Sequence, residues 1–79
     1  MKPEAGEIFS LKEQVVTVET DGDRVNALVL PAGSVVRIVA YPSKRDDRIA
    51  EALCDGREVL ILTADLQSRA FKVRVGARG

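Results

Sequence analysis

Short runs of residues with high strand propensity, separated by turn signals, constrain this sequence most strongly. β-Branched residues dominate residues 14–20 and 35–41, and such residues favour extended strands. Asp-Gly pairs stand at 21–22 and 55–56, where they favour tight hairpin turns. A Pro-Ala-Gly-Ser turn at 31–34 separates two further runs. The pattern therefore predicts an all-β fold built from short strands.

Six segments are predicted as strands, and one further segment is left open. The predicted strands cover residues 14–20, 24–30, 35–41, 48–54, 57–63 and 71–75. Residues 7–12 contain an apolar cluster that fits either a first strand or a loop plug. Thr63 or Asp65 is expected to cap a short helical turn that places Leu66 inward.

Alternation within the strands predicts which side chains face the core. Val36, Ile38 and Ala40 form a cleanly apolar face, which should point inward. A second predicted face carries only small residues, namely Ala50, Ala52 and Cys54. In the last strand the charged positions, Lys72 and Arg74, are expected to point outward, where they would guard an exposed edge.

Seventy-nine residues allow one domain with one aliphatic core. We expect a flexible N-terminal arm at 1–6, a domain at 7–76 and a C-terminal tail at 77–79. A chain of this length buries only about 60% of its unfolded surface, so its stability is marginal. Self-association is a common source of further burial in small domains.

The residue types needed for most catalytic and metal chemistry are scarce. The sequence has no histidine, and Cys54 is its one cysteine. We therefore predict no catalytic, cofactor-binding or metal-binding residues, and a protein that is not an enzyme. One free thiol, no signal-peptide pattern and no apolar run of about 20 residues favour a cytoplasmic protein without membrane contact.

The order of elements from Leu30 to Val73 resembles an SH3-like small barrel. A glycine turn leads into the strand at 35–39, and a charged loop, a hairpin at 55–57 and a helical turn at 64–68 precede the last strand. The resemblance implies a five- to six-stranded barrel with a single helical turn before the last strand. It implies no activity, because the aromatic cluster of peptide-binding SH3 domains and the Val-Gln-Ile-Tyr motif of plasmid-type dihydrofolate reductases are both missing.

Apolar residues on both faces of one strand indicate an interface. Val25, Ala27 and Val29 lie on one face of residues 24–30, and Leu28 lies on the other. A chain this short cannot bury both faces by itself. We therefore predict a small adaptor or binding module that acts through protein contacts, forms a homo-oligomer, and uses Val25, Ala27, Leu28 and Val29 as its interface.

A nucleic-acid-binding barrel is the alternative. Its candidate residues would form an arginine-rich face with one aromatic side chain available for stacking. These residues are Arg37, Tyr41, Lys44, Arg45, Arg48 and Arg57. The formal net charge of +0 gives this alternative less support, because such proteins usually carry a basic excess.

Three large side chains have two open interpretations. Phe9, Leu28 and Tyr41 either cluster on the surface as part of an interface or plug the open ends of the barrel as core.

Overall fold

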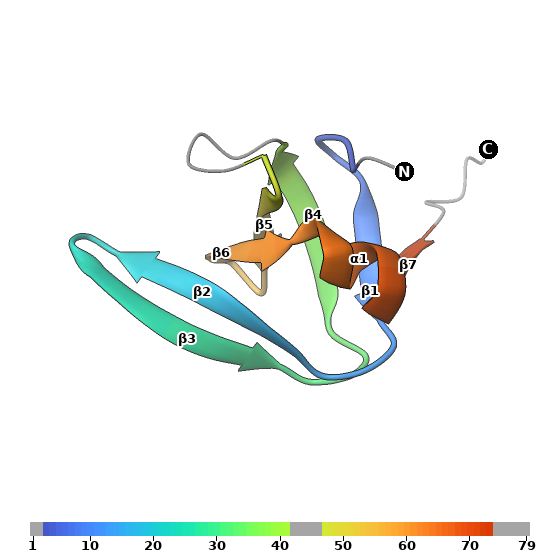
Figure 1. Cartoon of the computed structure of the whole chain (residues 1–79), viewed down its shortest axis with the longest axis horizontal. Helices are drawn as coiled ribbons and strands as arrows, with labels where there is room; N and C mark the ends of the chain where they lie inside the picture. Colours follow the sequence, from blue (N-terminus) through green and yellow to red (C-terminus); the bar gives the residue numbers. More distant parts are fainter. Residues whose placement is uncertain (1–2, 42–46, 74–79) are drawn as a thin grey trace.

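The computed structural model describes residues 3–41 and 47–73, and within these ranges the chain is all-β with one short helix (Figure 1). The elements in chain order are β1 (Ile8–Leu11), β2 (Val15–Asp21), β3 (Arg24–Leu30), β4 (Val35–Ala40), β5 (Ile49–Cys54), β6 (Arg57–Leu62), α1 (Thr63–Arg69) and β7 (Ala70–Val73). They form one antiparallel sheet in the order β3-β2-β6-β5-β4-β1-β7. In the described part of the chain, no helix is long and apolar enough to cross a bilayer.

The predicted five- to six-stranded barrel is wrong in strand count and in closure. Residues 8–11, left open above, form β1, which pairs with both β4 and β7. The two end strands, β3 and β7, do not pair with each other in the described ranges. Within the sheet, β2 pairs with β6 at Val18↔Leu60 and Glu19↔Val59, which joins the β2–β3 hairpin to the other strands. We call β2 and β3, residues 15–30, the projecting hairpin, and the remaining elements the body (Figure 1).

The hairpin between β5 and β6 confirms the turn predicted at 55–56. Asp55 and Gly56 have φ angles of 51° and 79°. Positive φ at both central residues is the geometry of the hairpin turns that match the right-handed twist of strands. Glycine adopts it without steric cost, and aspartate tolerates it better than most residues. This turn aligns the two strands with Ala50 opposite Ile61 and Ala52 opposite Val59.

Alternate positions of the body strands make the core. Val36 and Ile38 of β4 are buried, as predicted, and Ala40 is half-buried. The small-residue face of β5 is also buried, which confirms that prediction. The rest of the buried apolar set comes from several elements: Leu11, Val15, Leu30, Val59, Ile61, Leu66 and Ala70. Burial of one such large aliphatic side chain contributes about 1.5–3 kcal/mol.

The helix α1 begins without the side-chain cap that was predicted. Leu62 occupies the N-cap position and makes no capping hydrogen bond. The Thr63 hydroxyl instead donates to the Arg48 carbonyl oxygen at 3.1 Å, and the Thr63 amide donates to the same oxygen at 2.9 Å. Asp65 pairs with Arg69 one turn later at 3.3 Å. Leu66 is buried, as predicted, so the helix covers one end of the core.

In the last strand, the face that was predicted to point outward is the one that contains buried Ala70. Lys72 is itself exposed but lies on the same face as buried Ala70, and Phe71 is 53% exposed on the other face. The reason is the pairing with β1, in which Ala70 stands opposite buried Leu11 and fixes the inward face. Arg74 and the tail at 77–79 lie outside the described residues.

The described part of the predicted N-terminal arm, residues 3–6, packs on the body. Pro3 is buried. The Gly6 amide donates to the Ile38 carbonyl oxygen at 2.7 Å, and the Ile38 amide donates to the Glu7 carbonyl oxygen at 2.8 Å. These bonds extend the contact between β1 and β4 toward the N-terminus.

Candidate interaction surfaces

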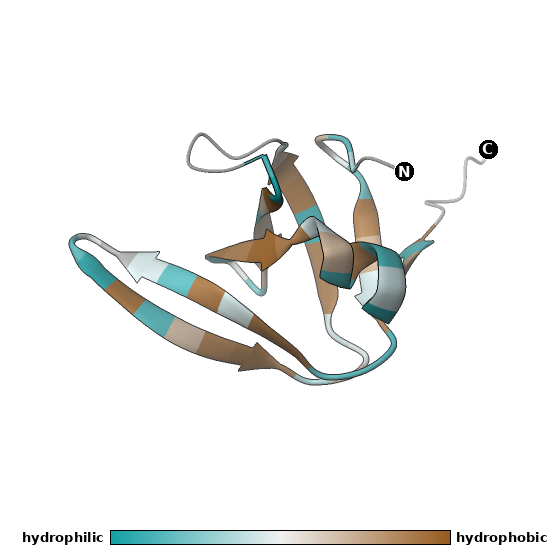
Figure 2. Ribbon diagram, in the orientation of Figure 1, coloured by the Kyte–Doolittle hydropathy of each residue, from teal (hydrophilic) through white to brown (hydrophobic). Residues whose placement is uncertain are grey.

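The outward face of the projecting hairpin is apolar on both of its strands. Cross-strand register places Val16 opposite Val29 and Val18 opposite Ala27, so these four side chains share one face. Val25, opposite Thr20 near the tip, is 63% exposed, and Val16 is 58% exposed. We call Val16, Val18, Val25, Ala27 and Val29 the outward face of the hairpin. Figure 2 shows apolar bands on both strands, with polar residues more frequent toward the tip.

The opposite face attaches the hairpin to the body. Val15 and Leu30, which are register partners, are both buried in the core. Thr17 is 1% exposed, and its hydroxyl donates to the Leu28 carbonyl oxygen at 2.8 Å. This bond satisfies a buried polar group that would otherwise be costly. The base of the hairpin is therefore part of the core, while the part beyond Glu19 and Asn26 extends past the pairing with β6.

A polar contact supports the middle of the hairpin. The Glu19 carboxylate lies 3.7 Å from the Arg57 guanidinium at the start of β6. Both residues share the inward side of the sheet, because Glu19 stands opposite buried Val59 and Arg57 stands opposite buried Cys54. An ion pair this exposed contributes about 0–1 kcal/mol. It links the hairpin to the body but adds little to the free energy of unfolding.

The residues predicted as an interface separate into two groups. Val25, Ala27 and Val29 are exposed on the outward face. Leu28 is half-buried and packs against the core. Val16 was not singled out from the sequence, although its side chain completes the outward face. Only the cross-strand pairing of Val16 with Val29 shows that Val16 belongs to this face. The sequence alone does not show which residues of two strands are paired.

The candidate arginines do not gather on one face in the described ranges. Arg37 stands opposite Leu53, whereas Arg57 stands opposite the next residue, Cys54. Successive residues of a strand point to opposite faces, so these two guanidinium groups project on opposite sides of the sheet. Arg48 lies just before β5, at the end far from Arg57. Lys44 and Arg45 lie outside the described residues.

The three large side chains with two interpretations lie at the periphery of the core. Phe9, Leu28 and Tyr41 are half-buried, and each packs against the buried cluster. This arrangement favours the interpretation in which they plug the open parts of the sheet.

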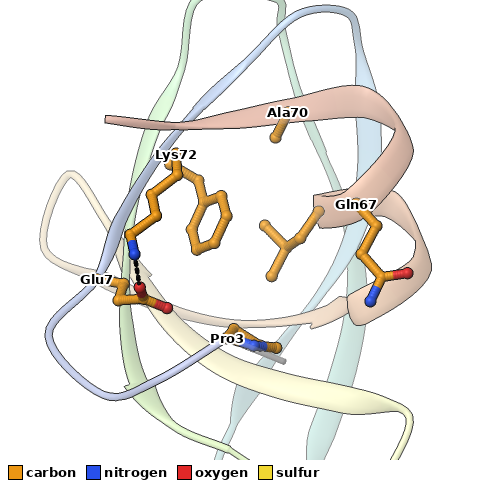
Figure 3. A pocket seen from close by; sticks show the side chains of 7 residues that line it. Pro3, Glu7, Gln67, Ala70 and Lys72 are labelled. Carbon is orange, nitrogen blue, oxygen red and sulfur yellow. Dashed lines mark ion pairs between the residues drawn. The ribbon is translucent and has the colours of Figure 1, made fainter. Parts of the chain in front are cut away.

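A pocket of about 330 Å³ lies between the N-terminal segment, β1, β7 and α1 (Figure 3). Its lining residues are Pro3, Glu7, Phe9, Leu66, Gln67, Ala70 and Lys72. Figure 3 shows Glu7 and Lys72 facing each other on one side of the pocket, with Gln67 on the opposite side. The volume lies at the lower end of the range for small-molecule sites.

The two charged residues of this pocket, Glu7 and Lys72, form an ion pair with each other. The ammonium group of Lys72 contacts the Glu7 carboxylate, and the Glu4 amide donates to Glu7 Oε1 at 2.7 Å. The Lys72 contact, followed by the Glu4 amide, lowers the pKa of the Glu7 carboxyl below its ordinary value of 4.5. The pair therefore offers no uncompensated charge to a ligand, and the remaining walls are mostly apolar. The sequence alone did not indicate this pocket, because Lys72 was assigned to the outward face.

The one cysteine of the chain, Cys54, occupies a position that lowers the reactivity of its thiol. Cys54 is buried at the end of β5. Burial, with the neighbouring Asp55 carboxylate as the smaller cause, raises the pKa of the Cys54 thiol. A raised pKa keeps the thiol protonated and weakly nucleophilic. Within the described ranges, no group of three or more acidic or cysteine side chains is arranged to hold a metal ion.

Comparison with known proteins supplies no relative for this chain. No known protein family, no curated protein and no solved structure matches it.

Proposed function

We propose that this protein is a small, non-enzymatic binding module that acts through protein–protein contacts and associates with a second copy through the projecting hairpin. The apolar outward face of the hairpin is the observation that carries this proposal. Exposed apolar side chains that are contiguous on one surface mark interaction sites in small proteins. Here the contiguity is set by register, because Val16 and Val29, and Val18 and Ala27, are cross-strand partners.

A second copy is the occupant that fits the chain best. Its formal net charge is +0, so two copies approach without long-range repulsion. The described residues of β3 carry one charged side chain, Arg24, at the tip end, and the rest of the strand is uncharged. A domain of 79 residues also gains proportionally more from added burial than a larger one does.

We further propose that the order of elements in this open sheet is SH3-like. The hairpin at 55–56 and the helix between β6 and β7 support the SH3-like order of elements. A buried free thiol at Cys54 supports a reducing, cytoplasmic location.

Light scattering after size exclusion, over a range of protein concentrations, tests the proposal. We expect the mass to rise from the chain mass of 8.6 kDa toward twice that value as concentration increases. Val25→Lys places a charge on the outward face and should weaken association at least tenfold, about 1.4 kcal/mol. Val39→Lys is the matched control, because Val39 is an exposed valine of β4 in the body, and it should leave association unchanged.

Two outcomes would contradict the proposal. One is a mass equal to the chain mass at every concentration, and the other is equal weakening by Val25→Lys and Val39→Lys. The same measurement with a short mixed oligonucleotide at low salt tests the alternative. A gain in mass that salt abolishes would favour nucleic-acid binding over self-association.

A further inference from the structure

The edge of β3 that faces away from β2 is open. Within the described ranges β3 pairs with β2 alone, over all seven of its residues from Arg24 to Leu30. Its register with β2 runs without a bulge from end to end. A strand at the edge of a sheet presents a row of backbone N–H and C=O groups that can pair with another strand.

This edge lacks the features that usually protect an edge strand. Charged side chains, prolines, bulges and short length are the common protections. Residues 25–30 contain no charge and no proline, and the strand is seven residues long. The opposite edge, β7, differs on both counts, because it has four residues and carries Lys72 in an ion pair with Glu7. The contrast makes β3 the less protected of the two edges.

We propose that two copies of this protein associate by antiparallel pairing of β3 with β3 across a two-fold axis at Ala27. The inference rests on the proposed self-association and specifies its geometry. Centring on Ala27, the middle residue of Arg24–Leu30, is the register in which all seven residues of each strand find a partner. Val25 then stands opposite the partner's Val29, and the two Ala27 residues face each other. The most exposed valine of the hairpin thereby gains an apolar neighbour on its open side.

The charges of the strand favour this antiparallel arrangement. A parallel in-register pairing would place Arg24 beside the partner's Arg24, which is unfavourable. The antiparallel pairing separates the two Arg24 residues by about 20 Å, because their positions are six residue steps of about 3.4 Å apart along the strand. Each Arg24 then stands opposite the partner's Leu30, which is buried at the base of the hairpin.

The length of the seam sets the expected strength. Seven residues make a seam of about 24 Å. Stable complexes bury about 800 Å² per partner, which is more than one strand edge and its adjacent side chains supply. We therefore expect a dimer with a dissociation constant in roughly the micromolar range, which dissociates on dilution.

Disulfide cross-linking tests the register directly. In a Cys54→Ala background, Ala27→Cys places two thiols across the two-fold axis. The paired Cα atoms of an antiparallel ladder are about 4.5–5.5 Å apart, within the range for a disulfide. We expect cross-linking under mild oxidation at least tenfold faster than for Val25→Cys, whose two thiols would be about 14 Å apart along the seam. A mixture of the Val25→Cys and Val29→Cys proteins should cross-link, whereas each alone should not.

Two results would overturn the inference in distinguishable ways. A concentration-dependent dimer in which Ala27→Cys cross-links no faster than Val25→Cys would retain self-association but reject this register. A chain that stays monomeric by light scattering, with no cross-linking at any of the three positions, would reject both self-association and the edge pairing.

Discussion

The projecting hairpin and the body are both built from strands rich in apolar residues, but they place those residues differently. In β4 of the body, Val36 and Ile38 are buried while Val35 and Arg37 are exposed, so one face serves the core. In the hairpin, only the base reaches the core, and the outward face remains apolar along both strands. The body buries one face of its strands and leaves other apolar side chains exposed, Val39 and Phe71 among them, whereas the hairpin gathers exposed valines of two paired strands on one face.

This difference separates residues that maintain the fold from residues that are free to bind. A core substitution should act on the free energy of unfolding and leave the interaction surface intact. A substitution on the outward face should act on association and leave the isolated chain nearly as stable.

The largest effect is expected from a cavity in the body. Ile61→Ala removes a fully buried side chain of β6 and should lower the free energy of unfolding by about 2–5 kcal/mol. Val25→Ala removes a mostly exposed side chain and should change it by less than about 0.5 kcal/mol. Urea denaturation at a concentration too low for association measures both values. Equal losses for the two variants would show that the outward face is part of the fold after all.

A smaller effect is expected where the hairpin joins the body. Thr17→Val keeps the shape of the side chain but removes the hydroxyl that donates to the Leu28 carbonyl oxygen. The loss of this buried hydrogen bond should cost about 0.5–1.5 kcal/mol in urea denaturation. Thr20→Val makes the same chemical change on the outward side of the same strand and should be nearly neutral. A neutral Thr17→Val would mean that the hydroxyl does not hold the base of the hairpin.

The elements that were predicted correctly are those whose signals are local. The turn at 55–56 follows from the backbone freedom of its own two residues, and the buried face of β4 follows from its strict alternation. The strand at 24–30 was predicted with its observed bounds, and its apolar character on both faces was visible in the sequence.

The features that were missed depend on pairing between distant segments. Hydropathy alone gives no reason to bury Thr17 in place of Val16 or Val18, but pairing with β3 sets Thr17 opposite Leu28 on the inward side. Lys72 was placed outward because its strand alternates cleanly, and its register with Phe9 of β1 reverses that assignment. Barrel closure was also beyond the sequence, because it depends on pairing between the two end strands, β3 and β7, which are far apart in the chain.

The smallest predicted effect concerns the protected edge at β7. The pKa of Glu7 is lower in the folded chain than its ordinary value, chiefly because Lys72 contacts the carboxylate. A carboxyl with a depressed pKa stabilises the fold above its unfolded pKa, and this contribution is lost as the pH falls through the folded pKa. Wild type should therefore lose more stability than Glu7→Gln on acidification below about pH 4.5.

Glutamine at position 7 isolates the effect of the carboxylate charge. Glu7→Gln removes the charge but keeps Oε1, which accepts the Glu4 amide, so the turn before β1 should persist. The expected difference is below about 1 kcal/mol, because the pair is partly exposed to solvent. Glu58→Gln, an exposed position of β6, controls for the change in net charge. If both variants follow the wild-type pH profile of urea denaturation, the ion pair does not stabilise this edge, and β7 would owe its protection to its short length alone.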